Sequence, residues 1–236
     1  LMTDNPFKEE IKKLREKYKY IVLLPLQFNN FYLFDLEADY KSQFEYLEDV
    51  LIKTSKYKDI GIVVTQHPGV RFLNSYNIKY FRDNYNNFIY LENSENYISV
   101  SQIMIPFVDA VMTVSTSVGY HTLLWDKKLI TLGKNYLKAF SDCNSLSELD
   151  KMFSSDSDYY EKKKFLYWII TNYVIPESYI KNEKWLEEFL KRGIESKNSM
   201  DRFYAPTDSS EKLFEHLIEK TSENLSGSII NYSNEY

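Results

Sequence analysis

Three hydroxyl side chains follow one another directly after a short apolar run, in the stretch MTVSTSVGYHTLLWDKKLITLG at residues 112–133. Ser115, Thr116 and Ser117 precede a short apolar segment typical of a helix. One hydroxyl is enough to cap a helix, whereas unpaired N–H groups at its start, joined by extra hydroxyl donors, favour a phosphate. Gly119 would let the backbone pack or a ligand approach closely. The triplet therefore predicts a phosphate site, with simple capping as the competing interpretation.

Two further polar clusters come directly after apolar runs typical of buried strands. Gln27 follows IVLLPL, and the pair His67-Pro68 follows IGIVVT. An imidazole in such a place can donate a hydrogen bond to a phosphate or leaving group, although His-Pro also occurs in ordinary turns. Arg71, just beyond this turn, is a candidate partner for phosphate, with an ordinary exposed arginine as the alternative. His121 is interpreted as a packing or rim residue.

The elements that must position these residues alternate between apolar runs and amphipathic segments. We expect strands at 21–26, 60–65, 88–91, 110–114 and 128–132. Helical spacing of apolar residues occurs between them, at 40–56, 100–107 and 118–125. Ser99 or Ser101 would cap the second of these helices. Apolar strands separated by helices predict a doubly wound, Rossmann-like α/β fold with a mostly parallel sheet covered on both faces.

Ligands of such a sheet bind beyond the carboxyl ends of its strands, where loops meet helix N-termini. All three polar clusters fall at predicted strand ends. We therefore expect Gln27, His67 and the hydroxyl triplet to converge on one anion pocket.

The chain is expected to divide into three parts. Residues 1–19 form an N-terminal helix or linker, residues 20–155 the Rossmann-like domain, and residues 156–236 a helical extension with a polar tail. Ser145 with Glu148 predicts a capping box. Further helices are expected at 161–173 and 182–190, the second ended by Gly193 in the C′ position.

Composition excludes several classes of protein. The 236 residues carry a net charge of −5, which argues against a nucleic-acid partner bound through a basic surface. Cys143 is the single cysteine, so neither a disulfide framework nor a cysteine metal site is expected. The longest apolar runs are too short to span a bilayer, and the charged N-terminus lacks a signal peptide's apolar core. These features predict a cytoplasmic location.

Other motifs that carry chemistry are absent from the sequence. Neither a P-loop, a GxGxxG fingerprint, an HExxH zinc motif nor a GxSxG elbow occurs. Asp35, Glu37 and Asp39 alternate in LFDLEAD, and the pattern is interpreted as a charged surface loop.

The order of these motifs resembles the capsule polysaccharide biosynthesis family, which includes the bacterial β-Kdo transferases. The matching residues are Pro25, Leu26, Gln27, His67, Pro68, Thr116, Ser117, Val118, Gly119, Leu123, Leu124, Lys127, Gly133 and Tyr136. Asp126 and Lys128 replace the glycine and proline of the family's Gly-Lys-Pro turn, and His121 stands where an acidic residue is frequent. The resemblance covers roughly residues 21–136, with a weaker match in YVIPESYIKNEKWLEEFL.

The resemblance implies a GT-B glycosyltransferase, in which the C-terminal of two Rossmann-like domains holds the nucleotide-sugar. This chain supplies one such domain and is expected to be the donor-binding part of a longer enzyme. The implied reaction transfers Kdo or a related acid sugar from a CMP donor onto a polysaccharide or lipid-linked glycan. His67 would be the catalytic residue, and Thr116 and Ser117 would hold the phosphate. No metal or other cofactor is expected.

Two other functions stay open. A teichoic-acid-type phosphotransferase would use the same cradle with CDP-glycerol or CDP-ribitol and transfer a polyol phosphate. A non-catalytic module would only bind a nucleotide-sugar or glycan within a capsule assembly complex. A peripheral membrane association is also open, because LREKYKYIVLL and EKKKFLYWII have basic flanks, although solvated helix faces explain them equally well.

Overall fold

The structure, a computed structural model, describes residues 6–29, 31–67, 70–172, 174–175 and 177–197. These residues fall into two compact units, one ending at Asp158 and one beginning at Tyr159. The first unit contains the sheet, and the second contains helices.

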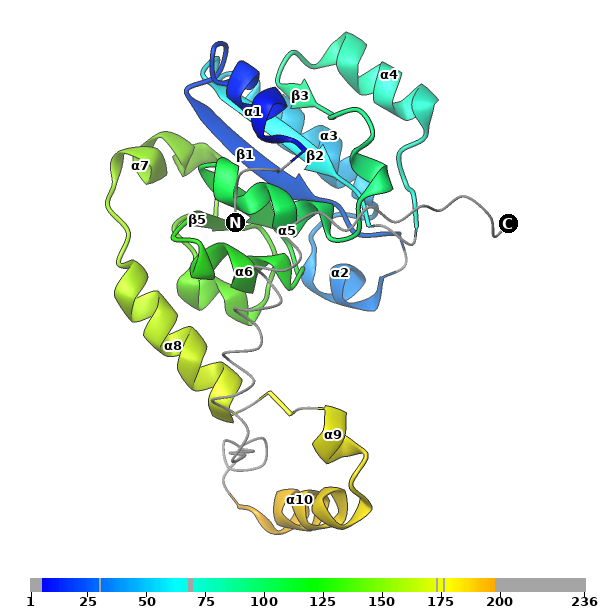
Figure 1. Ribbon diagram of the computed structural model, residues 1–236, viewed down its shortest axis with the longest axis vertical. Coiled ribbons are helices and arrows are strands. Elements are labelled where there is room, and N and C mark those ends of the chain that lie inside the picture. The colour runs from blue at the N-terminus through cyan, green and yellow to red at the C-terminus, as the bar shows by residue number, and fades with distance from the viewer. Residues whose placement is uncertain (1–5, 30, 68–69, 173, 176, 198–236) are drawn as a thin grey trace. The chain divides into compact units, whose positions relative to one another are not determined.

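The first unit is built on five parallel strands (Figure 1). They are β1 (Tyr20–Pro25), β2 (Ile60–Thr65), β3 (Phe88–Ile89), β4 (Ala110–Thr113) and β5 (Lys128–Thr131). Their order in the sheet is β3-β2-β1-β4-β5, and every pair is parallel. β1 and β2 pair over their whole length, from Tyr20 beside Ile60 to Pro25 beside Thr65. The prediction of a doubly wound, Rossmann-like α/β fold is confirmed.

Helices cover both faces of this sheet, as Figure 1 shows. They are α1 (Lys8–Leu14), α2 (Tyr32–Glu37), α3 (Gln43–Thr54), α4 (Ser75–Asn84), α5 (Val100–Met104), α6 (Val118–Leu124) and α7 (Leu149–Ser154), with 3-10 turns η1 (Ser94–Asn96), η2 (Ile105–Phe107), η3 (Tyr136–Phe140) and η4 (Leu146–Glu148). Val22 and Leu24 of β1 belong to the apolar cluster formed with α3, α4 and α7, whereas Ile21 and Leu23 join α1, α5 and α6. Successive strand residues point to opposite faces, so an all-apolar strand packs against both helical layers.

Asp109 ties the N-terminal helix to the sheet. Its carboxylate accepts two hydrogen bonds from the Arg15 guanidinium, at 2.9 and 3.2 Å, and one from the backbone N–H of Ile21 at 2.7 Å. Phe7 and Ile11 are buried in the same apolar cluster as Ile21 and Leu23 of β1. The N-terminal segment thus packs as a part of the first unit.

Several local predictions were wrong. Asp35 and Glu37 lie in helix α2, and not in a loop. Ser99 occupies the start of α5 in a left-handed conformation, with φ of 55°, and its side chain caps nothing there. Ser145 accepts from the N–H of Ser147 and opens the 3-10 turn η4, so the expected capping box with Glu148 is replaced by a tighter turn. Each case depends on a short element that tertiary packing stabilises.

Helix α4 was missing from the sequence-based expectation. Its start is a true capping box, because Asn74 accepts from the N–H of Asn77 and the Asn77 side chain accepts from the N–H of Asn74. The usual signature has Ser or Thr followed by Glu or Gln, so an Asn-x-x-Asn box is easy to overlook.

The second unit contains α8 (Tyr159–Asn172), α9 (Glu177–Ile180) and α10 (Glu183–Glu195). Asn182 caps α10 by accepting from the N–H of Trp185 at 3.1 Å. Gly193 lies inside α10, so the prediction that it ends this helix was wrong. The expected tail, from residue 198 onward, lies outside the described residues. Within the described ranges, no helix has the length and apolar character needed to cross a membrane.

Candidate active-site pocket

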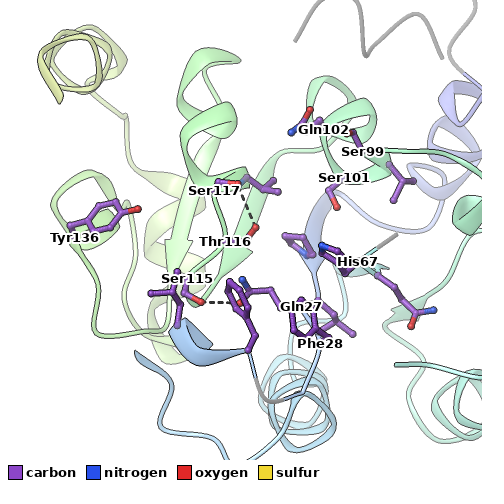
Figure 2. Close-up of a pocket in the computed structure, with 17 residues that line it drawn as sticks. Gln27, Phe28, His67, Ser99, Ser101, Gln102, Ser115, Thr116, Ser117 and Tyr136 are labelled. Carbon is purple, nitrogen blue, oxygen red and sulfur yellow. Dashed lines mark hydrogen bonds between the residues drawn. The ribbon is translucent and has the colours of Figure 1, made fainter. Parts of the chain in front are cut away.

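A pocket of about 400 Å³ opens at the carboxyl edge of the sheet (Figure 2). Its walls come from the segments after β1, β2 and β4, from the first turn of α5, and from Tyr136. The strand order reverses between β1 and β4, and a crevice at such a switch point is the usual ligand site of open parallel sheets. The fold therefore puts the pocket where a ligand is expected.

Five of the predicted site residues line this pocket: Gln27, His67, Ser115, Thr116 and Ser117. Figure 2 shows His67 on one side and Thr116 with Ser117 on the other. β1 lies between β2 and β4 in the sheet. The segments that follow β2 and β4 therefore face each other across the carboxyl end of β1. The structure thus brings the imidazole and the hydroxyl groups to one rim, while their roles in binding stay predictions.

Ser115 does not present its hydroxyl to the pocket as the phosphate prediction requires. The side chain is buried, and its Oγ donates to Oε1 of Gln27 at 2.8 Å, as the dashed line in Figure 2 shows. The backbone N–H of Gln27 in turn donates to Oε1 of Gln43 at 3.2 Å. Because the carbonyl end of the Gln27 amide is occupied, its NH₂ end, which has no partner among the described residues, is the part left to donate to a ligand.

The second hydroxyl of the triplet caps α6. Thr116 Oγ1 accepts from the N–H of Val118 at 3.4 Å, and the N–H of Thr116 donates to Thr113 Oγ1 at 3.1 Å. The capping interpretation therefore holds for Thr116, although a hydroxyl that accepts can still donate its own hydrogen. Ser117 is exposed, and its side chain forms no cap. Ser117 and Thr116 are thus the two hydroxyl donors available to an anion.

His67 is exposed at the end of β2 and has an aromatic neighbour from the segment after β1. The rings of His67 and Phe28 meet edge to face, with centroids 5.3 Å apart and an interplanar angle of 76°. Such a contact favours one ring orientation over others. Phe28 was not singled out in the sequence, because nothing in an isolated Phe distinguishes a pocket wall from core.

The remaining predicted residues do not line this pocket. Arg71 is exposed and borders a second, small hollow with Glu95, and His67 lines both this hollow and the main pocket. Gly119 is buried, and a Cβ there would lie 2.8 Å from Cδ1 of Leu137, so its evident role is close packing of α6. Pro68 lies outside the described residues.

Helix α5 contributes two polar groups, Ser101, which the sequence suggested only as a cap, and Gln102, which it did not suggest. The hydroxyls of Ser101 and Thr65 are 2.8 Å apart, and the amide nitrogen of Gln102 lies 3.1 Å from Nε2 of His121. Ser101 and Gln102 both line the pocket. Tyr136 forms the opposite wall, with its ring stacked on Tyr120 at a centroid distance of 5.8 Å. The sequence could have indicated Ser101 and Gln102 as pocket residues, because they are polar residues at the start of a predicted helix that follows a predicted strand.

His121 predicts an acid-side loss of stability. Burial lowers the pKa of this imidazole below its usual 6.5. The unfolded chain then binds more protons than the folded chain as pH falls below about 6.5, so the free energy of unfolding falls with it. We expect the melting temperature of the native sequence to drop more between pH 7 and pH 5 than that of His121→Gln, which keeps a partner for Gln102. Equal drops in calorimetry would contradict the prediction.

The sequence was compared with models of protein families. Residues 2–152, well over half of the chain, match the model described as capsule polysaccharide biosynthesis protein. The chain belongs to this family. The match spans the whole sheet and every described residue of the pocket, which confirms the resemblance seen in the sequence. The search of curated proteins found no match.

Solved structures offer weaker likenesses. Thermosulfurimonas dismutans KpsC, a beta Kdo 2,7 transferase, is 19% identical, with a TM-score of 0.39, over 58% of this chain and 45% of its own. The wall teichoic acid polymerase TagF is 13% identical, with a TM-score of 0.36, over 95% of this chain and 50% of its own. A TagF variant soaked with CDPG is 11% identical, also with a TM-score of 0.36, over 95% and 50%. The chain thus spans about half the length of these proteins, and the family assignment does not depend on them.

Proposed function

We propose that the chain is the donor-binding domain of a GT-B glycosyltransferase in capsular polysaccharide synthesis. The donor is a CMP-linked sugar, Kdo or a related acid sugar, and the acceptor is a growing polysaccharide or lipid-linked glycan. The observation that carries the proposal is the meeting of His67, Thr116 and Ser117, from separate loops, around one pocket at the switch point of the sheet.

The chemistry needs donors aimed at the leaving phosphate. As the bond between the sugar and the nucleotide breaks, negative charge grows on the phosphate oxygens, and preplaced hydrogen-bond donors stabilise the transition state more than the ground state. His67 would donate to, or protonate, the leaving oxygen. Thr116, Ser117 and the NH₂ group of Gln27 would hold the other oxygens. Ser115 already orients the Gln27 amide, because its hydroxyl donates to Oε1 and leaves the NH₂ group toward the ligand.

The pocket also agrees with a ligand of this size. Its volume of about 400 Å³ lies within the usual range for small-molecule sites, about 300–1,000 Å³. Among the residues that the structure describes, no cluster of three or more His, Cys, Asp or Glu side chains could hold a metal ion. The proposed mechanism uses the side chains of the pocket and the groups of the donor.

A thermal-shift panel with CMP, CDP, UDP and GDP tests the donor. A ligand at a hundred times its dissociation constant stabilises the folded state by about 2.7 kcal/mol. We expect CMP to raise the melting temperature, and Ser117→Ala to reduce this rise. Ser154→Ala, at an exposed position in α7, is the control and keeps the full rise. A panel without any shift would end the proposal for this domain.

Product analysis separates transfer of a sugar from transfer of a polyol phosphate. The full-length enzyme is incubated with donor and acceptor, and the mass of the product is measured by mass spectrometry. A glycosyltransferase adds the mass of a sugar alone, whereas a teichoic-acid-type enzyme leaves a phosphate on the acceptor. Binding of CMP without any product points to a non-catalytic module.

A further inference from the structure

Gln66, the residue before His67, has a side-chain amide that forms three hydrogen bonds within the protein. It is buried, with 8% of its surface exposed. Its Oε1 accepts from the N–H of Leu73 at 2.5 Å, and its Nε2 donates to the carbonyl of Leu73 at 3.1 Å. The amide thus pairs with both backbone groups of one residue, as a neighbouring strand would. It thus ties Gln66 to Leu73, the residues on either side of the His67 loop, by which we mean His67 and residues 70–72 among the described residues.

The orientation of this amide is determined by two further side chains. Nε2 of Gln66 also donates to the hydroxyl of Tyr90 at 2.8 Å, and that hydroxyl donates to Oε2 of Glu95 at 3.0 Å. A hydroxyl has a single hydrogen, so Tyr90 can only accept from Gln66 while it donates to Glu95. The nitrogen of the amide must therefore face Tyr90. This leaves Oε1 toward the N–H of Leu73.

This arrangement bears directly on His67. The loop that Gln66 closes begins at His67, whose carbonyl accepts from the N–H of Val70 at 3.3 Å. Without the amide, Leu73 would still pack in the apolar core, but its backbone N–H and carbonyl would lose their bonds to Gln66, and the imidazole could take other positions relative to the hydroxyls across the pocket. A misplacement of about 1 Å can cost about 10²-fold in rate.

We propose that Gln66 is a positioning residue, which holds the His67 loop so that the imidazole faces Thr116 and Ser117 across the pocket. The inference deepens the proposed function and rests on it for the kinetic effect alone. Gln66 itself acts through His67, and its amide is committed to Leu73 and Tyr90. The position of the His67 ring can be measured whether or not the domain transfers a sugar.

The plain alternative is that Gln66 only stabilises the fold. The chain offers a matched control in Asn87, another buried amide, which is 5% exposed. Its Nδ2 donates to the carbonyl of Leu51 at 3.2 Å and to Oγ1 of Thr54 at 2.8 Å. Asn87 precedes β3, at the amino end of the strands and thus away from the pocket. Replacing either amide by an apolar side chain of similar shape removes two buried hydrogen bonds. The backbone groups of Leu73 then lose their bonds to Gln66, whereas the Leu51 carbonyl still accepts from the N–H of Ser55 at 3.0 Å.

The first experiment compares Gln66→Met with Asn87→Leu in the full-length enzyme. Both variants are expected to lower the melting temperature. Gln66→Met should also lower kcat by about 10–100-fold with little change in KM for the donor, whereas Asn87→Leu should leave kcat within about twofold of the native value. The milder Tyr90→Phe keeps both bonds to Leu73 and should lower kcat less. Equal kcat in Gln66→Met and Asn87→Leu would overturn the proposal.

A second variant gives a pH signature, with kcat expressed per folded enzyme because an ionised buried carboxylate also destabilises the fold as pH rises. The introduced carboxyl of Gln66→Glu, when protonated, can accept from the N–H of Leu73 and donate to its carbonyl, as the amide does. When ionised it can only accept, and burial favours the protonated form. The ratio of Gln66→Glu kcat to native kcat should therefore rise as pH is lowered from 8 to 6. A flat ratio would contradict positioning by this amide.

The third readout is independent of catalysis. The ring signals of His67 are observed by NMR in the isolated chain and assigned with His67→Gln. We expect them to move or broaden in Gln66→Met and to stay unchanged in Asn87→Leu. If the native enzyme transfers no sugar but this contrast is seen, the proposed function fails while the positioning role stands. Unchanged His67 signals in Gln66→Met would overturn the positioning role.

Discussion

Replacement of His67 by alanine is expected to lower turnover by about 10²–10⁴-fold, the usual contribution of a general acid. The imidazole lines the pocket, and an imidazole can both donate a hydrogen bond and transfer a proton. The measurement is kcat at saturating donor and acceptor with the full-length enzyme. Because the donor is also held by Thr116, Ser117 and Gln27, KM for the donor should change much less than kcat.

Two controls make this result specific. His67→Gln keeps a hydrogen-bond donor but cannot pass a proton, so its loss of turnover separates hydrogen bonding from protonation. His216→Gln changes a histidine to which the sequence assigns no role and should leave turnover at the native value. Native turnover in His67→Ala would remove His67 from the mechanism and leave Thr116, Ser117 and Gln27 as the proposed donors to the leaving phosphate.

Replacement of Gly133 by alanine is expected to cost about 3 kcal/mol in the free energy of unfolding, the upper part of the range for overpacking. A Cβ at this position would lie 2.7 Å from the backbone oxygen of Val114, as well as 2.7 Å from Cγ1 of the same residue. The backbone oxygen cannot turn away as a side chain can. The strain would fall beside β4, next to Ser115 and the pocket.

The matched control for this prediction is Gly119→Ala. Its Cβ would come equally close to another atom, but that atom is the end of the Leu137 side chain, at 2.8 Å. A leucine can adjust its rotamer, so we expect a cost of about 1 kcal/mol. In a protein of this size, the difference corresponds to roughly 4–8 °C in melting temperature by calorimetry. Equal losses at the two glycines would show that the Val114 carbonyl can move freely.

The strands could be located from the sequence because their environment leaves a strong signal. β1, β2, β4 and β5 are covered on both faces, and this requires nearly continuous apolar runs such as IVLLPL and IGIVVT. The edge strand β3 is shorter than expected, Phe88–Ile89, and pairs with β2 over these two residues. Helix α2 has no side-chain cap, so packing on the sheet, more than local sequence, determines where it forms. Helix α4 has a capping box, but its Asn-x-x-Asn sequence is not the usual signature.

The sequence by itself determined the class of fold and the edge that carries the site. Parallel strands all point their carboxyl ends the same way, so polar residues after several strands must gather at one rim. Only the tertiary structure decided what each side chain does there. Ser115 turns to Gln27, 88 positions away, and Gln66 pairs with Leu73 and Tyr90. A hydroxyl or amide serves the ligand or the protein according to which partner lies within hydrogen-bonding distance, and strand order and side-chain packing determine that partner.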